Sequence, residues 1–277
     1  MVQIQLPQIL ETKIGEGGSA IVYKQVVDGK ERAIKVLKQQ VLKRKMIQAG
    51  MKLAQLKNEN IVGFIGICCR PSAFIYDFCG INIEDDIVTN VSQLLEILND
   101  QWSFDFHQRL SIINQATLGL NYLHSMNILH RDFKLSNLLV CGSPDKINVK
   151  VSDFDDVYIL KTAATTMCTG LRNMKGMTLS YVALEILNGV NISATKQSDV
   201  FSWALSSYEI MSKETSPWAN NLPVMSDALL LEAYKNNARP SFEHITPLYN
   251  EKDLISSMAR IITCACLLYT SPSPRDS

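Results

Sequence analysis

The stretch that decides the fold is His130-Arg131-Asp132-Phe133-Lys134-Leu135-Ser136-Asn137, and it is followed 21 residues after Asp132 by Asp153-Phe154-Asp155. The two runs carry acidic, amine and amide side chains at short spacing. Phosphoryl transfer needs such a set: an acid that accepts the proton of the substrate hydroxyl, a lysine near the moving phosphate, and an amide and a carboxylate on Mg²⁺. The residues that would supply these groups are, in that order, Asp132, Lys134, Asn137 and Asp153.

These runs resemble the catalytic loop and the metal-binding motif of the eukaryotic protein kinase family. The resemblance implies that Asp132 and Lys134 are catalytic, that Asn137 and Asp153 bind metal, and that ATP and Mg²⁺ are the cofactors. Asp155 departs from the family, which has glycine at this position. A side chain there resists backbone geometry that glycine permits, so Asp155 either limits the movement of the two residues before it or offers a second carboxylate to the metal.

A glycine-rich segment near the N-terminus fits the same interpretation. Gly15-Glu16-Gly17-Gly18-Ser19-Ala20-Ile21-Val22 matches the family's G-x-G-x-x-G-x-V with Ala20 at the third glycine, and Ala33-Ile34-Lys35 matches its A-x-K. Alone, a G-x-G run is more often an ordinary hairpin bend. Small residues would let backbone amides approach phosphates, and Lys35 would neutralise the α and β phosphates and join the catalytic set. The nucleotide-binding residues expected here are Gly15, Gly17, Gly18, Val22, Ala33 and Lys35.

The residues expected to hold adenine come after the last strand of the small lobe. Phe74-Ile75-Tyr76 predicts this strand, and Asp77-Phe78-Cys79-Gly80 predicts a hinge whose backbone would meet the adenine edge. The resemblance places Tyr76 where family members restrict the back pocket. The further nucleotide-binding residues that it implies are Tyr76, Asp77, Cys79 and Leu139.

The resemblance covers residues 9 to 265 and implies an α+β, two-lobed protein kinase fold. Residues 1–79 would form a lobe with a small antiparallel sheet, one helix and the glycine-rich loop, and residues 80–265 a larger, mainly helical lobe that is incomplete at its end. Residues 266–277 resemble a translated sequencing adapter and are excluded from the expected fold. A natural Ser/Pro-rich tail is the alternative.

Hydrophobic patterning predicts the elements of the small lobe. Residues 9–37 predict three antiparallel strands, broken at residues 15–18 and at the hairpin signal Asp28-Gly29. Strand character resumes at Asn60-Ile61-Val62. The apolar residues between, which recur at helical spacing and predict a helix, are Met46, Ala49, Leu53 and Leu56.

In the larger lobe, two helices are predicted around the catalytic stretch. One precedes it, with apolar positions from Leu110 to Leu120, and the other runs from Val200 to Met211 and is apolar on nearly all sides. Ser198 or Asp199 could be the N-cap of the second helix. The resemblance gives Asp199 another role, in which it orients the catalytic loop from beneath.

One further departure bears directly on activity. Family members place a glutamate in the helix after Lys35 to pair with this lysine, and Ala49 occupies that position here. No Asp or Glu occurs from Arg32 to Asn58, so Lys35 lacks a charge-assisted restraint from this helix. Two functions therefore remain open: an ATP-dependent kinase for Ser/Thr hydroxyls, or a pseudokinase that serves as a nucleotide-binding signalling scaffold.

The segment between Asp153 and Glu185 is expected to control activity and to dock substrate. Residues 178–185 resemble the family's T-x-x-Y-M-A-P-E, with Leu184 in place of proline. Phosphates on the candidate sites Thr165, Thr166 and Thr169 could pair with Arg131. The body of the chain looks most like the tyrosine-kinase-like group, which implies protein substrates with Ser/Thr acceptors and possible signalling adaptors as partners.

Composition sets the remaining expectations. The 277 residues are 47% hydrophobic, enough to bury a sizeable core, and the formal net charge of zero favours neither nucleic acid nor a membrane as partner. The densest basic group, residues 43–45 with Lys52, is most simply a solvated helix face. Seven cysteines without a pair of C-x-x-C motifs, no visible signal peptide and no membrane span predict a reduced, cytoplasmic protein.

Overall fold

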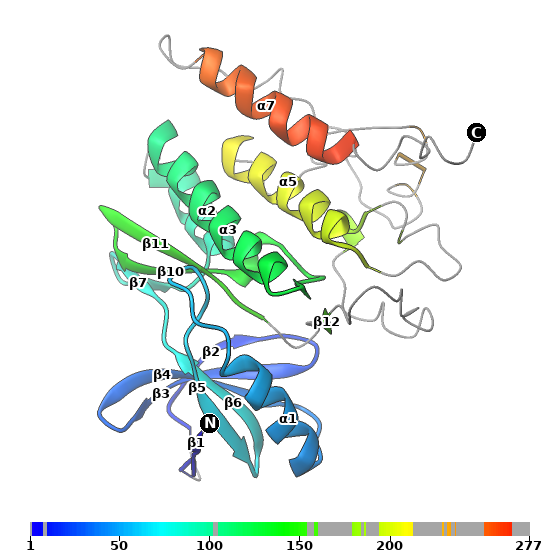
Figure 1. The fold of residues 1–277 in the computed structure, drawn as a ribbon. Helices are drawn as coiled ribbons and strands as arrows, with labels where there is room; N and C mark the ends of the chain where they lie inside the picture. The colour runs from blue at the N-terminus through cyan, green and yellow to red at the C-terminus, as the bar shows by residue number, and fades with distance from the viewer. Residues whose placement is uncertain are drawn as a thin grey trace, which may run out of the picture. The chain divides into compact units, whose positions relative to one another are not determined.

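The computed structural model confirms the α+β class, and it groups the chain into two compact units (Figure 1). The first unit is Met1–Thr89 with Leu139–Ser152, and the second is Asn90–Leu138 with Asp153–Ser277. The expected boundary between residues 79 and 80 differs from this division. The first unit also contains residues 80–89, before the catalytic loop, and residues 139–152, after it.

The structure describes residues 2–7, 10–101, 105–153, 158–159, 179–183, 186, 194–212, 229, 232–233, 236 and 252–267.

The first unit is built on a six-stranded sheet with the order β1-β5-β6-β4-β3-β2. β1 runs parallel to β5, and the other neighbours are antiparallel. The three strands expected within residues 9–37 and the strand at Phe74 are confirmed. The bounds are Val2–Gln3 (β1), Thr12–Glu16 (β2), Ala20–Val27 (β3), Lys30–Leu37 (β4), Phe64–Cys69 (β5) and Ser72–Asp77 (β6).

The hairpin between β3 and β4 turns at Asp28 and Gly29, as predicted. Their φ angles of 51° and 72° are both left-handed, which a two-residue hairpin of this kind requires at each central position. Glycine adopts this conformation without steric cost, and aspartate tolerates it better than most residues. One face of the sheet then packs into a core around Ile34, Ala73 and Ile75.

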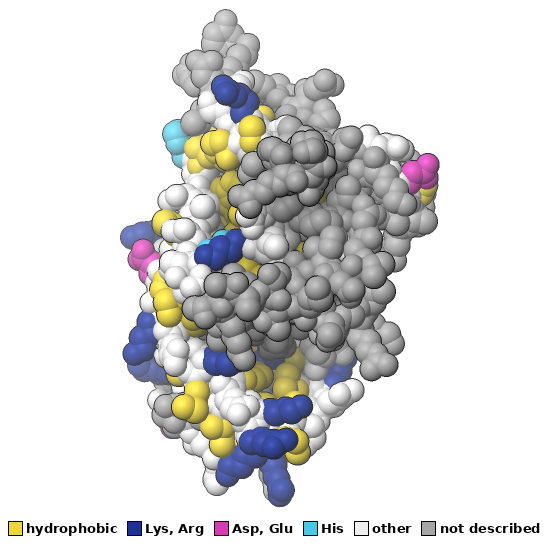
Figure 2. Space-filling view, turned by 45° about the vertical axis from the view of Figure 1, so that its right-hand side comes forward, with side chains coloured by type: hydrophobic (Ala, Val, Ile, Leu, Met, Phe, Trp, Pro, Cys, Tyr) yellow, Lys and Arg dark blue, Asp and Glu magenta, His cyan; other side chains and the backbone are white. Residues whose placement is uncertain are grey.

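Helix α1, Lys43–Leu53, contacts β5 through a stripe that buries Met46, Gly50 and Leu53. The helix is the one predicted, although it begins before the first apolar residue of the pattern. Its first turn carries three cations and no acidic residue, a charge pattern that the positive end of the helix dipole disfavours. Lysine and arginine side chains gather at this end of the unit (Figure 2).

The prediction of a strand at Asn60-Ile61-Val62 is wrong in its length. Only Ile61 has strand pairing, as an isolated β-bridge to Val151. Asn60 is nevertheless fixed, since its Nδ2 donates to the Val149 carbonyl at 3.1 Å. Two short hairpins complete the first unit. Their strands are Ile81–Ile83 (β7), Asp86–Val88 (β8), Leu138–Ser143 (β10) and Lys146–Val151 (β11).

The second unit is mainly helical. Asp105 opens its longest described helix with a capping box, accepting from the Gln108 backbone N–H at 2.7 Å while its own N–H donates to the Gln108 side chain at 3.1 Å. No helix in the described part of the chain is long and apolar enough to span a membrane. The elements are Val91–Gln101 (α2), Phe106–Ser125 (α3), Ile128–Leu129 (β9), Leu135–Asn137 (η1), Tyr158–Ile159 (β12), Leu179–Tyr181 (η3), Lys196–Ser212 (α5) and Lys252–Leu267 (α7).

Helix α5 lies between α3 and α7 and is buried along most of its length, as its apolar pattern predicts (Figure 1). The N-cap prediction is wrong. The helix begins at Lys196, and the Thr195 hydroxyl accepts from the Ser198 N–H at 3.2 Å while the Ser198 hydroxyl accepts from the Thr195 N–H at 3.1 Å. Asp199 therefore lies inside the first turn, and its carboxylate is free of capping.

Candidate active site

The catalytic stretch folds so that three of its polar side chains meet. Asp132 follows the short strand β9, and its Oδ2 lies 2.8 Å from Lys134 Nζ. Asn137, at the end of η1, donates from Nδ2 to the Asp132 carbonyl at 2.7 Å and to Asp132 Oδ2 at 3.0 Å. The carboxylate is thus oriented by one cation and one amide, which act on the same oxygen.

Asp199 anchors this loop from the start of α5. Its side chain is 1% exposed and accepts from the backbone N–H of His130 at 2.9 Å and of Arg131 at 2.8 Å. His124 Nε2, on α3, lies 2.9 Å from the same carboxylate. A buried carboxylate needs donors of this kind to replace water. The position confirms the expectation that Asp199 orients the loop.

The backbone of the site is strained at two points. Arg131 has a φ of 72° and Asp153 a φ of 64°, both in the left-handed region that non-glycine residues rarely adopt. Such strain persists only where surrounding contacts hold it, and it concentrates at functional sites. The two Asp199 hydrogen bonds hold the first of these residues.

The two expected metal ligands lie in the second unit, at the end of η1 and just after β11. The Asn137 amide is oriented through its Nδ2, and its oxygen is the atom that suits Mg²⁺, as are the Asp153 carboxylate oxygens. This donor set fits the ion by its chemistry. Phe154, Asp155, Leu184, Glu185 and the candidate phosphorylation sites lie outside the described residues, so those predictions stay predictions.

In the first unit, four of the expected nucleotide-binding residues share one face of the sheet. Val22 lies opposite Lys35 on β4, and Ala33 lies opposite Tyr76 on β6. Residues directly opposite in neighbouring strands point to the same side, and positions two apart on a strand do too. Ile34, between Ala33 and Lys35, points to the core on the other side.

The glycine-rich loop is the turn between β2 and β3, closed by a 2.9 Å hydrogen bond from Gly17 N–H to the Ala20 carbonyl. A Cβ added at Gly17 or Gly18 would meet no atom within 4 Å, and neither residue has a left-handed φ. Neither packing nor backbone geometry therefore requires glycine at these positions. Glu16 borders the turn, and Lys13 and Lys38 lower the pKa of its carboxyl to about 2.

The hinge is fixed through Asp77. Its N–H donates to the Gly63 carbonyl at 2.8 Å, and its carboxylate pairs with Arg32 on β4. A Cβ on Gly63 would collide with the Asp77 carboxylate as it lies here, so a larger residue at this position would displace the carboxylate from its present place. The sequence predicted Asp77 and Cys79 as part of the hinge but not the contributions of Gly63 and Arg32. Nothing in the sequence around these two residues marks Asp77 as their partner.

A second buried acid was also missed. Tyr181, in the T-x-x-Y motif, donates from its hydroxyl to Glu209 on α5 at 2.6 Å. Glu209 is 1% exposed, and burial raises the pKa of its carboxyl to about 8. Burial also raises the pKa of Tyr181, with smaller contributions from Glu209 and Asp132. The pair ties the motif to the helix that anchors the catalytic loop.

The raised pKa of Glu209 predicts a pH-dependent stability. Because the carboxyl holds its proton to a higher pH in the folded protein than in the unfolded chain, the free energy of unfolding should fall as pH rises from about 4.5 to about 8. A tenfold difference in proton affinity between the two states is worth about 1.4 kcal/mol. Urea unfolding at several pH values should show this slope in the wild type and a flatter profile in Glu209→Gln; equal slopes would contradict the assignment.

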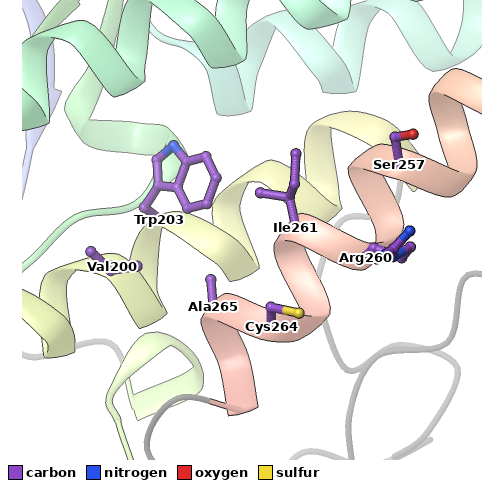
Figure 3. Close-up of a pocket in the computed structure, with 7 residues that line it drawn as sticks. All are labelled: Val200, Trp203, Ser257, Arg260, Ile261, Cys264 and Ala265. Atoms are coloured by element: carbon purple, nitrogen blue, oxygen red, sulfur yellow. The ribbon is translucent and has the colours of Figure 1, made fainter.

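A cavity of about 560 Å³ lies away from these residues, between α5 and α7 of the second unit (Figure 3). Trp203, on its wall, donates from Nε1 to the Thr117 hydroxyl on α3 at 2.8 Å. None of the predicted site residues lines it; the lining residues are Val200, Trp203, Ser257, Arg260, Ile261, Cys264 and Ala265.

Comparison with known proteins agrees with this geometry. The sequence model described as "Protein kinase domain" matches residues 9–274. Dual specificity protein kinase shkE of Dictyostelium discoideum is 27% identical over 86% of this chain, and shkB of the same organism is 32% identical over 74%. Cysteine-rich receptor-like protein kinase 44 of Arabidopsis thaliana is 29% identical over 80%. The matches span 35%, 30% and 56% of these relatives, so this chain covers only part of their length.

Proposed function

This chain belongs to the protein kinase domain family, and we propose that it transfers the γ-phosphate of ATP to serine and threonine hydroxyls of protein substrates. The observation that carries the proposal is the Asp132 carboxylate, paired with Lys134 and Asn137 on a loop that the buried Asp199 anchors. A carboxylate held in one orientation by its neighbours is what the positioning of an acceptor hydroxyl requires.

Each polar residue of the loop has a role in this reaction. Asp132 orients the acceptor hydroxyl and takes its proton as the new bond forms. Lys134, whose ammonium lies beside that carboxylate, stabilises negative charge on the transferring phosphoryl group. Asn137 and Asp153 would hold Mg²⁺, which when bound neutralises charge on the phosphates.

The first unit would bind the nucleotide. Lys35 would meet the α and β phosphates as a point charge, and the backbone around Gly17 would approach the phosphates closely. Glycines that the fold itself does not need support this role, because a ligand is a remaining reason for their small size. Val22, Ala33 and Tyr76 lie on the same sheet face as Lys35 and would contact the base.

The preference for Ser/Thr acceptors rests on Lys134 and on the relatives. Lysine two residues after the catalytic aspartate fits the Ser/Thr and tyrosine-kinase-like groups. Among the relatives, shkE and shkB are named dual specificity protein kinases, and drkD of Dictyostelium discoideum is named a probable serine/threonine-protein kinase. Phosphoamino-acid analysis of a labelled product would test this preference; label mainly on tyrosine would overturn it.

Nucleotide binding should depend on Gly17 but not on Gly29. Gly17→Ala adds a methyl group where backbone amides would face phosphate, so the affinity for ATP with Mg²⁺ should fall about tenfold, or ~1.4 kcal/mol, with an unchanged melting temperature. Gly29→Ala is the matched control: its φ of 72° should cost about 1–2 kcal/mol of stability and leave affinity unchanged. Calorimetric titration measures the ATP affinity of both variants, and their melting temperatures report the stability. Wild-type affinity in Gly17→Ala would contradict the proposed phosphate loop.

A second candidate function is a pseudokinase that binds nucleotide and acts as a signalling scaffold. The observation that favours it is helix α1, which carries no acidic residue and has Ala49 where the family pairs a glutamate with the strand lysine. The two candidates differ in one result. Stabilisation by ATP without any phosphate transfer would support the scaffold, since a ligand that binds only the folded state raises its stability.

A further inference from the structure

A lysine on β3 contacts the hinge from across the sheet of the first unit. Lys24 Nζ lies over the ring of Phe78, 4.6 Å from its centre, and Phe78 belongs to the hinge segment at residues 77–80. The same ammonium lies 2.6 Å from the Glu31 carboxylate on β4. The Lys24 side chain is only 23% exposed, so both contacts are partly shielded from water. The ammonium is therefore held by a carboxylate and by the face of an aromatic ring.

The register of the sheet places Lys24 on the face expected to bind nucleotide. Lys24 lies opposite Ala33 on β4, and Ala33 lies opposite Tyr76 on β6, next to the hinge. Residues directly opposite in neighbouring strands share a face, as do positions two apart on one strand. Lys35 is therefore on this face too, but opposite Phe74 and so farther from the hinge. The face carries one lysine toward the hinge and one away from it.

The Phe78 ring also packs against the hinge backbone itself. A Cβ added at Gly80 would lie 2.7 Å from Phe78 Cζ and 3.1 Å from Cγ2 of Ile87 on β8. The ring thus lies directly against Gly80, and a larger residue there would push the ring from its present place. A lysine ammonium is attracted to the face of an aromatic ring by the negative charge of its π system. Lys24 and Gly80 together therefore fix where the ring lies.

We propose that Lys24 is a positioning residue of the nucleotide site, whose ammonium, held by Glu31, fixes the Phe78 ring and with it the hinge backbone. The inference rests on the proposed function, in which this backbone meets the adenine edge. A hinge that is fixed before the ligand arrives loses less conformational entropy on binding. Lys24 would therefore favour binding of the base, whereas Lys35 would neutralise the phosphates. The two lysines should differ in which part of the ligand depends on them.

The first measurement is made on the full chain without nucleotide. Hydrogen exchange of the backbone amides at residues 78–80 reports local opening of the hinge. In Lys24→Met, exchange should be about fivefold faster, the order expected for loss of a partly exposed cation–π contact. Lys24→Arg should restore the wild-type rate, because a guanidinium also stacks on aromatic rings and pairs with carboxylates. Lys30→Met is the matched control, since it removes an exposed lysine of the same hairpin, and should exchange as the wild type does.

The second measurement compares the affinities for adenosine and for ATP with Mg²⁺ by calorimetric titration. Lys24→Met should weaken both by a similar factor, and Lys24→Arg and Lys30→Met should bind both as the wild type does. Lys35→Met should weaken ATP far more than adenosine. Phe78→Leu removes the ring that Lys24 holds, so adding Lys24→Met to this variant should cause little further loss of adenosine affinity.

Three results would overturn the positioning role of Lys24. These are unchanged hinge exchange in Lys24→Met, loss of ATP affinity with intact adenosine affinity in that variant, and failure of Lys24→Arg to restore exchange and binding. Absence of both adenosine and ATP binding in the wild type would instead overturn the proposed nucleotide site. Hinge exchange would then still decide whether Lys24 fixes the hinge.

Discussion

Replacing Asp132 with asparagine should lower phosphate transfer roughly a thousandfold, within the range that general base catalysis contributes. The amide keeps the size of the carboxylate but cannot take a proton from the acceptor hydroxyl. Lys134 loses its ionic partner, whereas Asn137 keeps its bond to the residue 132 carbonyl, so the loop should hold its shape. ATP affinity should stay within about twofold of the wild type, because binding and chemistry would be separated in this variant.

The matched control for this variant is Asp86→Asn on β8. It removes an exposed carboxylate of the same kind, which no described contact places in the site. Turnover and ATP affinity, measured on equal amounts of folded protein, should both match the wild type in the control. Transfer by Asp132→Asn at a rate close to the wild type would remove Asp132 from the catalytic role.

Asp199→Asn is expected to weaken both the loop and the fold. The carboxylate accepts from two backbone N–H groups and lies against His124, and the asparagine amide presents N–H groups where an acceptor is needed. A buried donor left unsatisfied costs about 1–3 kcal/mol. Without its anchors, the left-handed conformation of Arg131 should relax, and turnover should fall much more than ATP affinity does.

Chemical unfolding and single-turnover kinetics separate these two effects. Asp105→Asn is the control, because asparagine caps a helix as well as aspartate does and the Asp105 side chain is exposed. Its stability and turnover should be close to those of the wild type. If Asp199→Asn lost stability but kept full turnover per folded molecule, the carboxylate would be structural and would not position the catalytic loop.

Much of the fold follows from local signals. The alternation of apolar residues and the Asp28-Gly29 turn predict the β3–β4 hairpin. The α5 sequence, which is apolar on nearly all sides, predicts a buried helix, and both predictions are confirmed. The strand expected at Asn60 is not a full strand. The Asn60 side chain donates to the Val149 carbonyl, and the Asn60 carbonyl accepts from the Val151 N–H, both on a strand far away in sequence. The predicted N-cap of α5, Ser198 or Asp199, was wrong because the helix begins earlier, and the Thr195 hydroxyl accepts from the Ser198 N–H.

The candidate site likewise has a part that the sequence predicts and a part that it does not. Asp132, Lys134 and Asn137 lie close in sequence, so a short motif contains their mutual contacts. Glu209 was missed because its partner is 28 residues earlier, and a glutamate in an apolar helix carries no sign of burial.

The central claim is that this domain transfers phosphate. The most direct test is to incubate the purified chain and its Asp132→Asn variant with γ-labelled ATP, Mg²⁺ and a generic protein substrate, and to measure label on serine and threonine. The account predicts labelled product with the wild type and a roughly thousandfold lower rate with the variant. No labelled product from a wild-type protein that binds ATP, or equal labelling by both proteins, would contradict it.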